Sequence, residues 1–168
     1  MKGFGCRVLA FDLIQNQKLI GDRVVDYVSL DELYRKSDIV SLHVPLVSET
    51  NHLIDFAALK KMKPGVILVN TSRGALINTS ALVEGLKSGH IGGSALDVYE
   101  EEEEVFFHDH SSDVLQDDVL ARLMTFPNVI MTSHQGFLTE EALRNIAEVT
   151  LQNISEFESG GPLSNEVK

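Results

Sequence analysis

Short apolar runs and longer amphipathic segments alternate along this chain. The apolar runs have the length of buried strands and lie at 7–11, 38–42, 66–69, 93–98 and 129–131. Between them, the spacing of apolar residues predicts helices at 30–36, 55–62, 79–88 and 117–124. Strands that alternate with helices through short loops indicate right-handed crossovers. The pattern therefore predicts an α/β fold, with a doubly wound parallel sheet and helices on its faces.

Residues that cap helices support these boundaries. Ser29 and Glu32 form a capping box, and Asn78 can cap the helix that follows it. A last, longer helix is predicted from Thr139 to about Ser159, where Gly160 ends it. Its apolar residues fall on one face, and they are Leu143, Ile146, Ala147, Thr150, Ile154 and Phe157.

Charge and cysteine content exclude several classes of partner. The 168 residues carry a formal charge of −11 and contain no cluster of Lys and Arg that could follow a phosphate backbone, which argues against nucleic acid. Cys6 is the only cysteine, so an intrachain disulfide and a multi-thiolate metal site are both excluded. No apolar stretch approaches the length of a membrane span. The sequence predicts a cytoplasmic protein without a membrane partner.

Arg73 lies where the apolar run 66–69 ends and the segment Asn70-Thr71-Ser72-Arg73-Gly74 begins. The carboxyl edge of an open α/β sheet is where ligands bind, and a guanidinium there suits a carboxylate or a phosphate. An arginine on a solvated loop fits the same spacing equally well. What favours a site is that Glu102 and His134 also follow predicted strands, so that a cation, a carboxylate and an imidazole could meet at one edge.

His134 follows the strand at 129–131, within Ser133-His134-Gln135-Gly136-Phe137. Paired with a carboxylate, it would be held in one tautomer and its charged form would be favoured. It could then give a proton to the oxyanion that forms when a carbonyl is reduced, while Arg73 holds a substrate carboxylate. A nucleophilic hydrolase is less consistent with the sequence, because neither Ser72 nor Ser133 lies in a GxSxG turn.

Three further positions have two interpretations each. Asp12 after the first strand could hold the ribose hydroxyls of NAD and repel the extra phosphate of NADP, but the glycine fingerprint expected about 20 residues earlier is not in the sequence. Either the fold is another one, or the chain begins inside a longer protein. His43, before Val44 and Pro45, could contact a ligand or be structural, and Asp97 could bind a cofactor amide or cap its loop.

The acidic run Glu100 to Glu104 and the following His108-Asp109-His110 contain possible metal ligands. They lack the HExxH pattern and the fixed spacing of known metal sites. A hydrophilic loop with separate histidines is the simpler interpretation. No metal site is predicted.

Several motifs together resemble one family. Asn70-Thr71-Ser72-Arg73-Gly74, Ala95-Leu96-Asp97-Val98-Tyr99-Glu100 and the late His134 resemble the NAD-dependent D-isomer-specific 2-hydroxyacid dehydrogenases. Similarity is strongest to the fermentative, D-lactate-forming members. The motifs that carry it are Phe106-Phe107, Asp113-Val114-Leu115-Gln116-Asp117-Asp118-Val119, His134-Gln135-Gly136-Phe137-Leu138-Thr139 and Thr150-Leu151-Gln152-Asn153.

The resemblance implies roles for individual residues. Arg73 would bind and polarise a 2-keto acid, His134 would donate and accept the proton, and Glu102 would be its carboxylate partner. Phe137 would lie near the methyl group of the substrate. The implied contacts to NAD are Asp12 at the adenosine ribose, His43, Val44 and Pro45 on the adenine side, and Thr71, Ser72 and Asp97 by the nicotinamide.

The chain departs from the family at its front. Members begin with a substrate-covering domain, then a first strand and a glycine-rich phosphate turn, and this sequence has none of these. We therefore expect residues 1–138 to be a partial dinucleotide-binding domain of the Rossmann-like type, without its first strand and glycine-rich turn. Residues 139–168 would be a C-terminal helix and tail returning to the substrate domain.

The expected function is that of an NAD-dependent oxidoreductase fragment. Its parent would reduce pyruvate or a similar 2-keto acid to the D-2-hydroxy acid with hydride from NADH, and would form a homo-oligomer. The isolated fragment would be inactive. The alternative is a non-catalytic NAD-binding or subunit-interaction module, although such a module would not need the proton donor His134.

Overall fold

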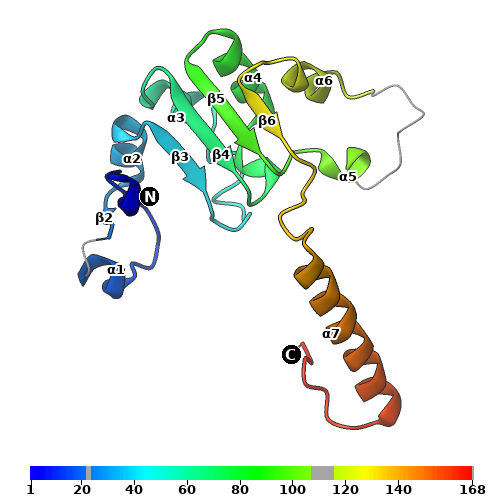
Figure 1. Ribbon diagram of the computed structural model, residues 1–168. Coiled ribbons are helices and arrows are strands. Elements are labelled where there is room, and N and C mark those ends of the chain that lie inside the picture. Colours follow the sequence, from blue (N-terminus) through cyan, green and yellow to red (C-terminus); the bar gives the residue numbers. More distant parts are fainter. Residues whose placement is uncertain (22–23, 107–115, 168) are drawn as a thin grey trace. The chain divides into compact units, whose positions relative to one another are not determined.

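The computed structural model describes residues 1–21, 24–106 and 116–167, which form two compact units (Figure 1). The first unit is Met1–Ser133, and the second is His134–Lys168. All the strands belong to the first unit, and the long helix α7 belongs to the second. The assignment of 1–138 to a dinucleotide-binding domain and of 139–168 to a helix and tail returning to another domain stays a prediction.

Four parallel strands form the main sheet of the first unit, in the order β3-β4-β5-β6 (Figure 1). Each strand pairs with the next one along the chain, and helices lie in every connection, which confirms the predicted α/β fold class. The strands are β3 (Ile39–Leu42), β4 (Val66–Asn70), β5 (Ile91–Leu96) and β6 (Val129–Met131). The helices between them are α3 (Phe56–Lys61), the 3-10 turn η2 (Gly74–Leu76), α4 (Thr79–Lys87), α5 (Glu102–Val105) and α6 (Asp118–Met124).

The core lies between one face of this sheet and the helices α3, α4 and α6. Alternate strand residues point into it, because successive side chains of a strand face opposite sides. The strand contribution consists of Val40, Leu42, Val66, Leu68, Ile91 and Leu96. The helices contribute Leu59, Leu82, Leu86, Leu120 and Leu123, all of which are buried.

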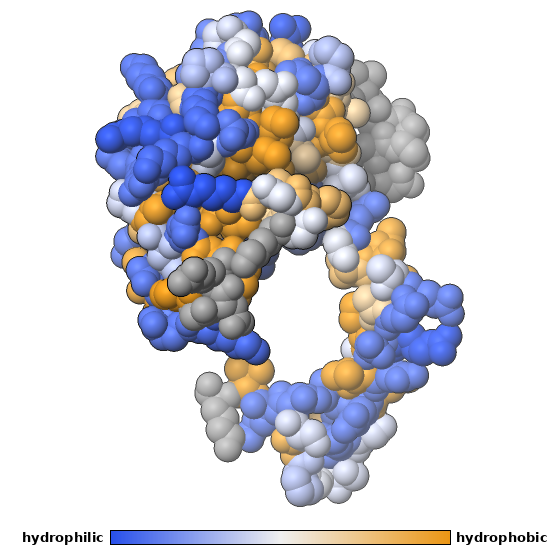
Figure 2. All heavy atoms as spheres, turned by 60° about the vertical axis from the view of Figure 1, so that its left-hand side comes forward, coloured by the Kyte–Doolittle hydropathy of each residue, from blue (hydrophilic) through white to orange (hydrophobic). Residues whose placement is uncertain are grey.

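The opposite face of the sheet is partly open to solvent in the described residues. Ile39, Ile67 and Ile130 alternate with the buried positions and are 54%, 40% and 69% exposed. Apolar side chains also reach the surface among hydrophilic ones in the space-filling view (Figure 2). The prediction of helices on both faces of the sheet is therefore confirmed for one face only.

A second, two-stranded parallel sheet consists of β1 (Leu9–Ala10) and β2 (Asp26–Tyr27), with α1 (Gln17–Gly21) between them in the sequence. The strand predicted at 7–11 is thus shorter than expected. Its register with β2 pairs only two residues of each strand, so the ladder that would define a longer strand is missing. Arg7, at the start of the predicted strand, instead forms an exposed ion pair with Asp26 at 3.0 Å.

Helix starts agree well with the sequence prediction. Before several of the helices, the side chain of the preceding residue accepts a hydrogen bond from a backbone amide in the first turn, which satisfies one of the amides that has no partner within the helix. Ser29 does this for α2 (Leu30–Lys36), and Asn78 for α4. The other residues that cap in this way are Asp55, Asp117 and Thr139.

The second unit consists mainly of α7 (Glu140–Ser159). Gly160 ends the helix in the left-handed conformation, with φ of 65°, as the sequence predicts. None of its residues is buried within the described structure, and the predicted apolar face is exposed along its whole length. Among the residues described, no helix combines the length and the apolar character needed to cross a membrane.

Candidate active site

The carboxyl ends of the four main strands meet at one edge of the sheet. Leu42, Asn70, Leu96 and Met131 are aligned across it by the register of the strand pairs. Several predicted site residues come directly after this row, because His43 follows β3, Thr71 to Arg73 follow β4 and Asp97 follows β5. The sheet therefore brings these segments side by side, as expected for the ligand edge of an open α/β sheet.

The turn that carries Arg73 is held by the buried side chain of Asn70, which is 1% exposed. Its amide nitrogen donates to the Arg73 carbonyl at 2.8 Å, and its amide oxygen accepts from the Ser72 backbone amide at 3.1 Å. The Ser72 hydroxyl donates to the Val44 carbonyl at 2.7 Å, which ties the turn to the segment after β3. Asn70 was not recognised in the sequence, although a polar residue at the end of an apolar strand is a signal.

Arg73 itself is exposed at this edge. Its guanidinium donates one hydrogen bond, from Nη1 to the Ser72 carbonyl at 2.7 Å, and it makes no ion pair with the residues that the structure describes. A guanidinium has five N–H donors in a planar fork, so most of them remain available to a ligand. The group is thus suited to bind a carboxylate in a two-pronged contact.

Asp97 links the ends of β5 and β6. Its Oδ1 accepts a hydrogen bond from the Thr132 hydroxyl at 2.5 Å, and its backbone amide donates to the Asn70 carbonyl at 2.9 Å. The half-buried carboxylate therefore has a defined place beside the Arg73 turn. Its contact with a cofactor amide stays a prediction.

Glu102 begins the short helix α5, on the loop that follows β5. Its Oε2 accepts a hydrogen bond from the backbone amide of Tyr99 at 3.0 Å, which turns the carboxylate back over its own loop. This loop passes directly over the segment after Arg73. A Cβ atom on Gly74 would lie 2.0 Å from the carbonyl carbon of Tyr99, so only glycine fits there.

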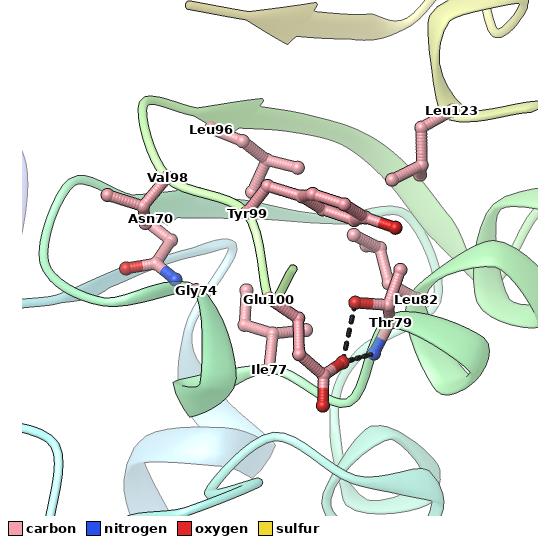
Figure 3. A pocket seen from close by; sticks show the side chains of 10 residues that line it. All are labelled: Asn70, Gly74, Ile77, Thr79, Leu82, Leu96, Val98, Tyr99, Glu100 and Leu123. Atoms are coloured by element: carbon pink, nitrogen blue, oxygen red, sulfur yellow. Dashed lines mark hydrogen bonds between the residues drawn. The ribbon is translucent and has the colours of Figure 1, made fainter. Parts of the chain in front are cut away.

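Glu100, two residues before Glu102, lies in a cluster that the sequence did not reveal. Its Oε1 lies 2.5 Å from Nε2 of His52. Its Oε2 accepts from the Thr79 backbone amide at 3.1 Å and from the Thr79 hydroxyl at 2.7 Å. A small pocket that Tyr99, Thr79 and Glu100 help to line lies beside the cluster, and its other walls are mostly the apolar side chains Ile77, Leu82, Leu96, Val98 and Leu123 (Figure 3).

The charge state of Glu100 follows from these contacts. Burial raises the pKa of the carboxyl, but the hydrogen bonds from Thr79 and His52 outweigh that effect and hold the pKa below its ordinary value of 4.5. The carboxylate is therefore charged at neutral pH. The nearby phenol of Tyr99 behaves oppositely, because burial and the carboxylate of Asp117 raise its pKa, so it stays neutral.

Glu100 should make the stability of the protein depend on pH. Because its pKa is lowered in the folded state, its contribution is fully present above about pH 4.5 and is lost as the pH falls through the lowered value. We expect Glu100→Gln to reduce the free energy of unfolding by roughly 1 kcal/mol near neutral pH, a modest value because the pair is partly exposed. The difference from the wild type should vanish in acid. Denaturant unfolding of both proteins between about pH 3 and pH 7 measures it, and a difference that is the same at every pH would contradict the assignment.

The other predicted cofactor contacts lie at strand ends. Asp12 follows β1 and is exposed, and its Oδ1 accepts a hydrogen bond from the Ile14 backbone amide at 3.1 Å. His43 is exposed after β3, with Nε2 at 2.8 Å from the Ser41 hydroxyl. Thr71 and Pro45 are exposed and Val44 is half-buried. Their contacts with NAD stay predictions.

His134 and Phe137 belong to the second unit, whereas Arg73 and Glu102 belong to the first. His134 has a positive φ of 53°, and within the described part of the chain only His52 shares this conformation among residues other than glycine. Such a backbone is uncommon for a side chain and is enriched at functional sites. Phe137 is 50% exposed. The meeting of His134 with Arg73 and Glu102 stays a prediction.

The possible metal ligands do not form a cluster in the part of the chain that is described. No group of three or more His, Cys, Asp or Glu side chains there could hold a metal ion. His108, Asp109 and His110 lie outside the described residues, as do Phe107 and residues 113–115 of the family motifs.

Comparisons with known proteins identify the family of the chain. Residues 1–136 match the model of the D-isomer specific 2-hydroxyacid dehydrogenase, NAD binding domain. The chain is 50% identical over 167 residues to the D-lactate dehydrogenase of Escherichia coli, covering 99% of this chain and 50% of that protein. It is 46% identical over 165 residues to an aromatic 2-oxoacid reductase of Clostridium sporogenes, covering 98% of this chain and 49% of that protein.

A solved structure shows the same fold. The structure described as the pyruvate reductase of Chlamydomonas reinhardtii superposes with a TM-score of 0.89 at 45% sequence identity, over 98% of this chain and 50% of that one. The chain thus spans about half the length of the curated relatives it matches. The Rossmann-like fold and NAD as the cofactor of the domain follow from these matches. The chain belongs to the D-isomer-specific 2-hydroxyacid dehydrogenases, and its residues 1–136 match the model of their NAD-binding domain.

Proposed function

We propose that the full-length protein reduces a small 2-keto acid, with pyruvate as the first candidate, to the D-2-hydroxy acid with hydride from NADH. The observation that carries the proposal is the exposed guanidinium of Arg73 at the carboxyl edge of the sheet, in a turn held by Asn70 and directly beneath the loop that bears Glu102. Family membership supplies the class of reaction.

The residues at this edge fit NAD as far as they are described. Asp12 offers an exposed carboxylate after β1, where it would accept the adenosine ribose hydroxyls. His43, Val44 and Pro45 would line the adenine side. Thr71, Ser72 and Asp97 would lie by the nicotinamide, at adjoining strand ends. When bound, NADH supplies the hydride for the reduction, and the chain's own residues bind, orient and protonate the substrate.

The substrate needs two kinds of help from the protein. Its carboxylate must be held, for which the fork of Arg73 is suited. Its carbonyl oxygen gathers negative charge during reduction and must receive a proton, for which His134 is the candidate. Glu102 would favour the charged imidazole and hold its orientation. Phe137 would present an apolar surface to the substrate's methyl group.

Two relatives suggest different side chains on the substrate. One is named for D-lactate and the other for aromatic 2-oxoacids. We place pyruvate first because the motif resemblance is strongest to the D-lactate-forming members. Phenylpyruvate is the alternative substrate.

Steady-state turnover by the full-length protein tests the proposal. We expect reduction of pyruvate with NADH, a much lower rate with NADPH because Asp12 repels its extra phosphate, and a D-configured product.

Arg73→Lys should raise the KM for pyruvate more than it lowers kcat, because an ammonium cannot make the two-pronged contact. A higher kcat/KM for phenylpyruvate would change the substrate assignment. NAD binding without turnover of either acid would overturn the proposal and favour a non-catalytic NAD-binding module.

A further inference from the structure

Three segments of the first unit meet near Gly74, which itself lies on one of them, directly after Arg73. The segment 52–54 runs beside the one that follows Arg73, because the His52 backbone amide donates to the Ala75 carbonyl at 2.7 Å and the Ile54 amide donates to the Leu76 carbonyl at 3.0 Å. The third segment is the loop 98–102, whose backbone touches Gly74. Arg73 directly precedes Gly74, and Glu102 lies on the loop that touches Gly74.

One carboxylate joins all three segments. Glu100 lies on the loop 98–102, and it bonds to His52 through Oε1. Its Oε2 bonds to the backbone amide and hydroxyl of Thr79, at the start of α4 (Figure 3). Together these three residues form the His52–Glu100–Thr79 cluster. Both carboxylate oxygens are used, and the side chains of His52 and Glu100 are 34% and 25% exposed. Partial burial makes such charge-assisted hydrogen bonds stronger than those on an open surface.

The imidazole of His52 is held in one tautomer. A carboxylate only accepts hydrogen bonds, so Nε2 carries the hydrogen that faces Glu100. On the other side, Nδ1 lies 3.4 Å from the amide nitrogen of Asn78. The amide oxygen of Asn78 accepts from the Ala81 amide as the helix cap, which leaves its nitrogen to donate to Nδ1. His52 is therefore oriented from both sides.

We propose that His52 and Glu100 are positioning residues for the reduction of the keto acid, and that their hydrogen bond fixes the loop bearing Glu102 beside the segment bearing Arg73. This inference rests on the proposed function. Glu102 is carried by this loop, and its carboxylate accepts a hydrogen bond from the Tyr99 amide of the same loop, so the place of the loop sets the place of the Glu102 backbone. The contact at Gly74 prevents the loop from coming closer, and the bonds of Glu100 prevent it from moving away.

The test compares two substitutions of His52 in the full-length protein. His52→Leu removes the donor to Glu100, whereas His52→Gln keeps a donor of similar reach. His90 provides the matched control, because its Nε2 bonds to the Leu59 carbonyl at 2.8 Å and it precedes β5, at the end of the sheet opposite to Arg73. The same two substitutions are made at His90.

Two readouts are measured, of which one does not depend on activity. Amide hydrogen exchange at Tyr99 reports whether the loop is held, and pyruvate kinetics report its effect on the reaction. We expect His52→Leu to speed amide exchange at Tyr99 and to leave the KM for NADH unchanged. It should lower kcat about tenfold, because small displacements of reacting groups reduce the rate of the chemical step strongly. His52→Gln should restore both readouts to within about threefold of the wild type. Neither His90 variant should change exchange at Tyr99.

Unchanged exchange at Tyr99 in His52→Leu would overturn the proposal, whatever the activity. Faster exchange with wild-type kcat would overturn the positioning role, because the loop would then move without consequence for the reaction. An equal loss of kcat in His90→Leu would also overturn it, since the effect would come from general destabilisation. If the wild type reduces no keto acid, the proposed function fails, and the exchange data alone still decide whether the cluster holds the loop.

Discussion

Replacement of His134 by alanine is expected to lower kcat for pyruvate reduction by about 100-fold or more, since general acid catalysis contributes factors of that size. The oxyanion that forms when hydride reaches the carbonyl carbon would lose its positioned proton donor. The KM for NADH should change little. Single-turnover kinetics with NADH absorbance follow the chemical step directly and separate it from product release.

Two other histidines serve as controls for this prediction. The His90 ring donates from Nε2 to the Leu59 carbonyl, and His43 is bonded to Ser41 at the predicted adenine side. His90→Ala should leave kcat near that of the wild type, and His43→Ala should act mainly on the KM for NADH. If His134→Ala keeps more than half of the wild-type rate while His43→Ala abolishes turnover, the proton donor has been assigned to the wrong residue.

The elements that could be predicted from the sequence are those whose signals are local. Ser29 and Asn78 cap their helices as expected, because a capping side chain needs only its own backbone and the next turn. The alternation of apolar strands with helices likewise identified the parallel sheet. The length of β1 could not be predicted, since it depends on how many residues of β2 pair with it.

The acidic run shows where sequence reasoning about the site ends. Glu100 and Glu102 are chemically identical and nearly adjacent, so no pattern separates their roles. The structure distinguishes their contacts, because Glu100 bonds to His52 and Thr79, which are distant in the sequence, whereas Glu102 accepts from the nearby Tyr99 amide. His52 could not be identified either, since its partner Glu100 lies 48 residues further along the chain.

Gly74→Ala is expected to cost about 3 kcal/mol of the free energy of unfolding, at the upper end for added volume in a packed site. The new Cβ would lie 2.0 Å from the carbonyl carbon and oxygen of Tyr99 and 2.4 Å from the Glu100 nitrogen. These are backbone atoms, so no side chain can rotate away, and the loop 98–102 must move as a whole. Because this loop bears Glu102 and Gly74 adjoins Arg73, the variant should also lose keto acid reduction in its folded fraction.

Substitutions at two other glycines show whether that loss comes from the steric contact with the loop 98–102 or from reduced stability alone. A Cβ on Gly3 meets nothing within 4 Å, so Gly3→Ala should change neither stability nor activity. Gly89 also has open space but a φ of 73°, so Gly89→Ala should cost about 1 kcal/mol through backbone strain while the folded protein keeps its turnover. Denaturant unfolding and turnover per folded molecule, measured on all three variants, test this. If Gly74→Ala behaves like Gly89→Ala, with stability reduced and turnover intact, then the close approach of the two loops does not govern the placement of Glu102.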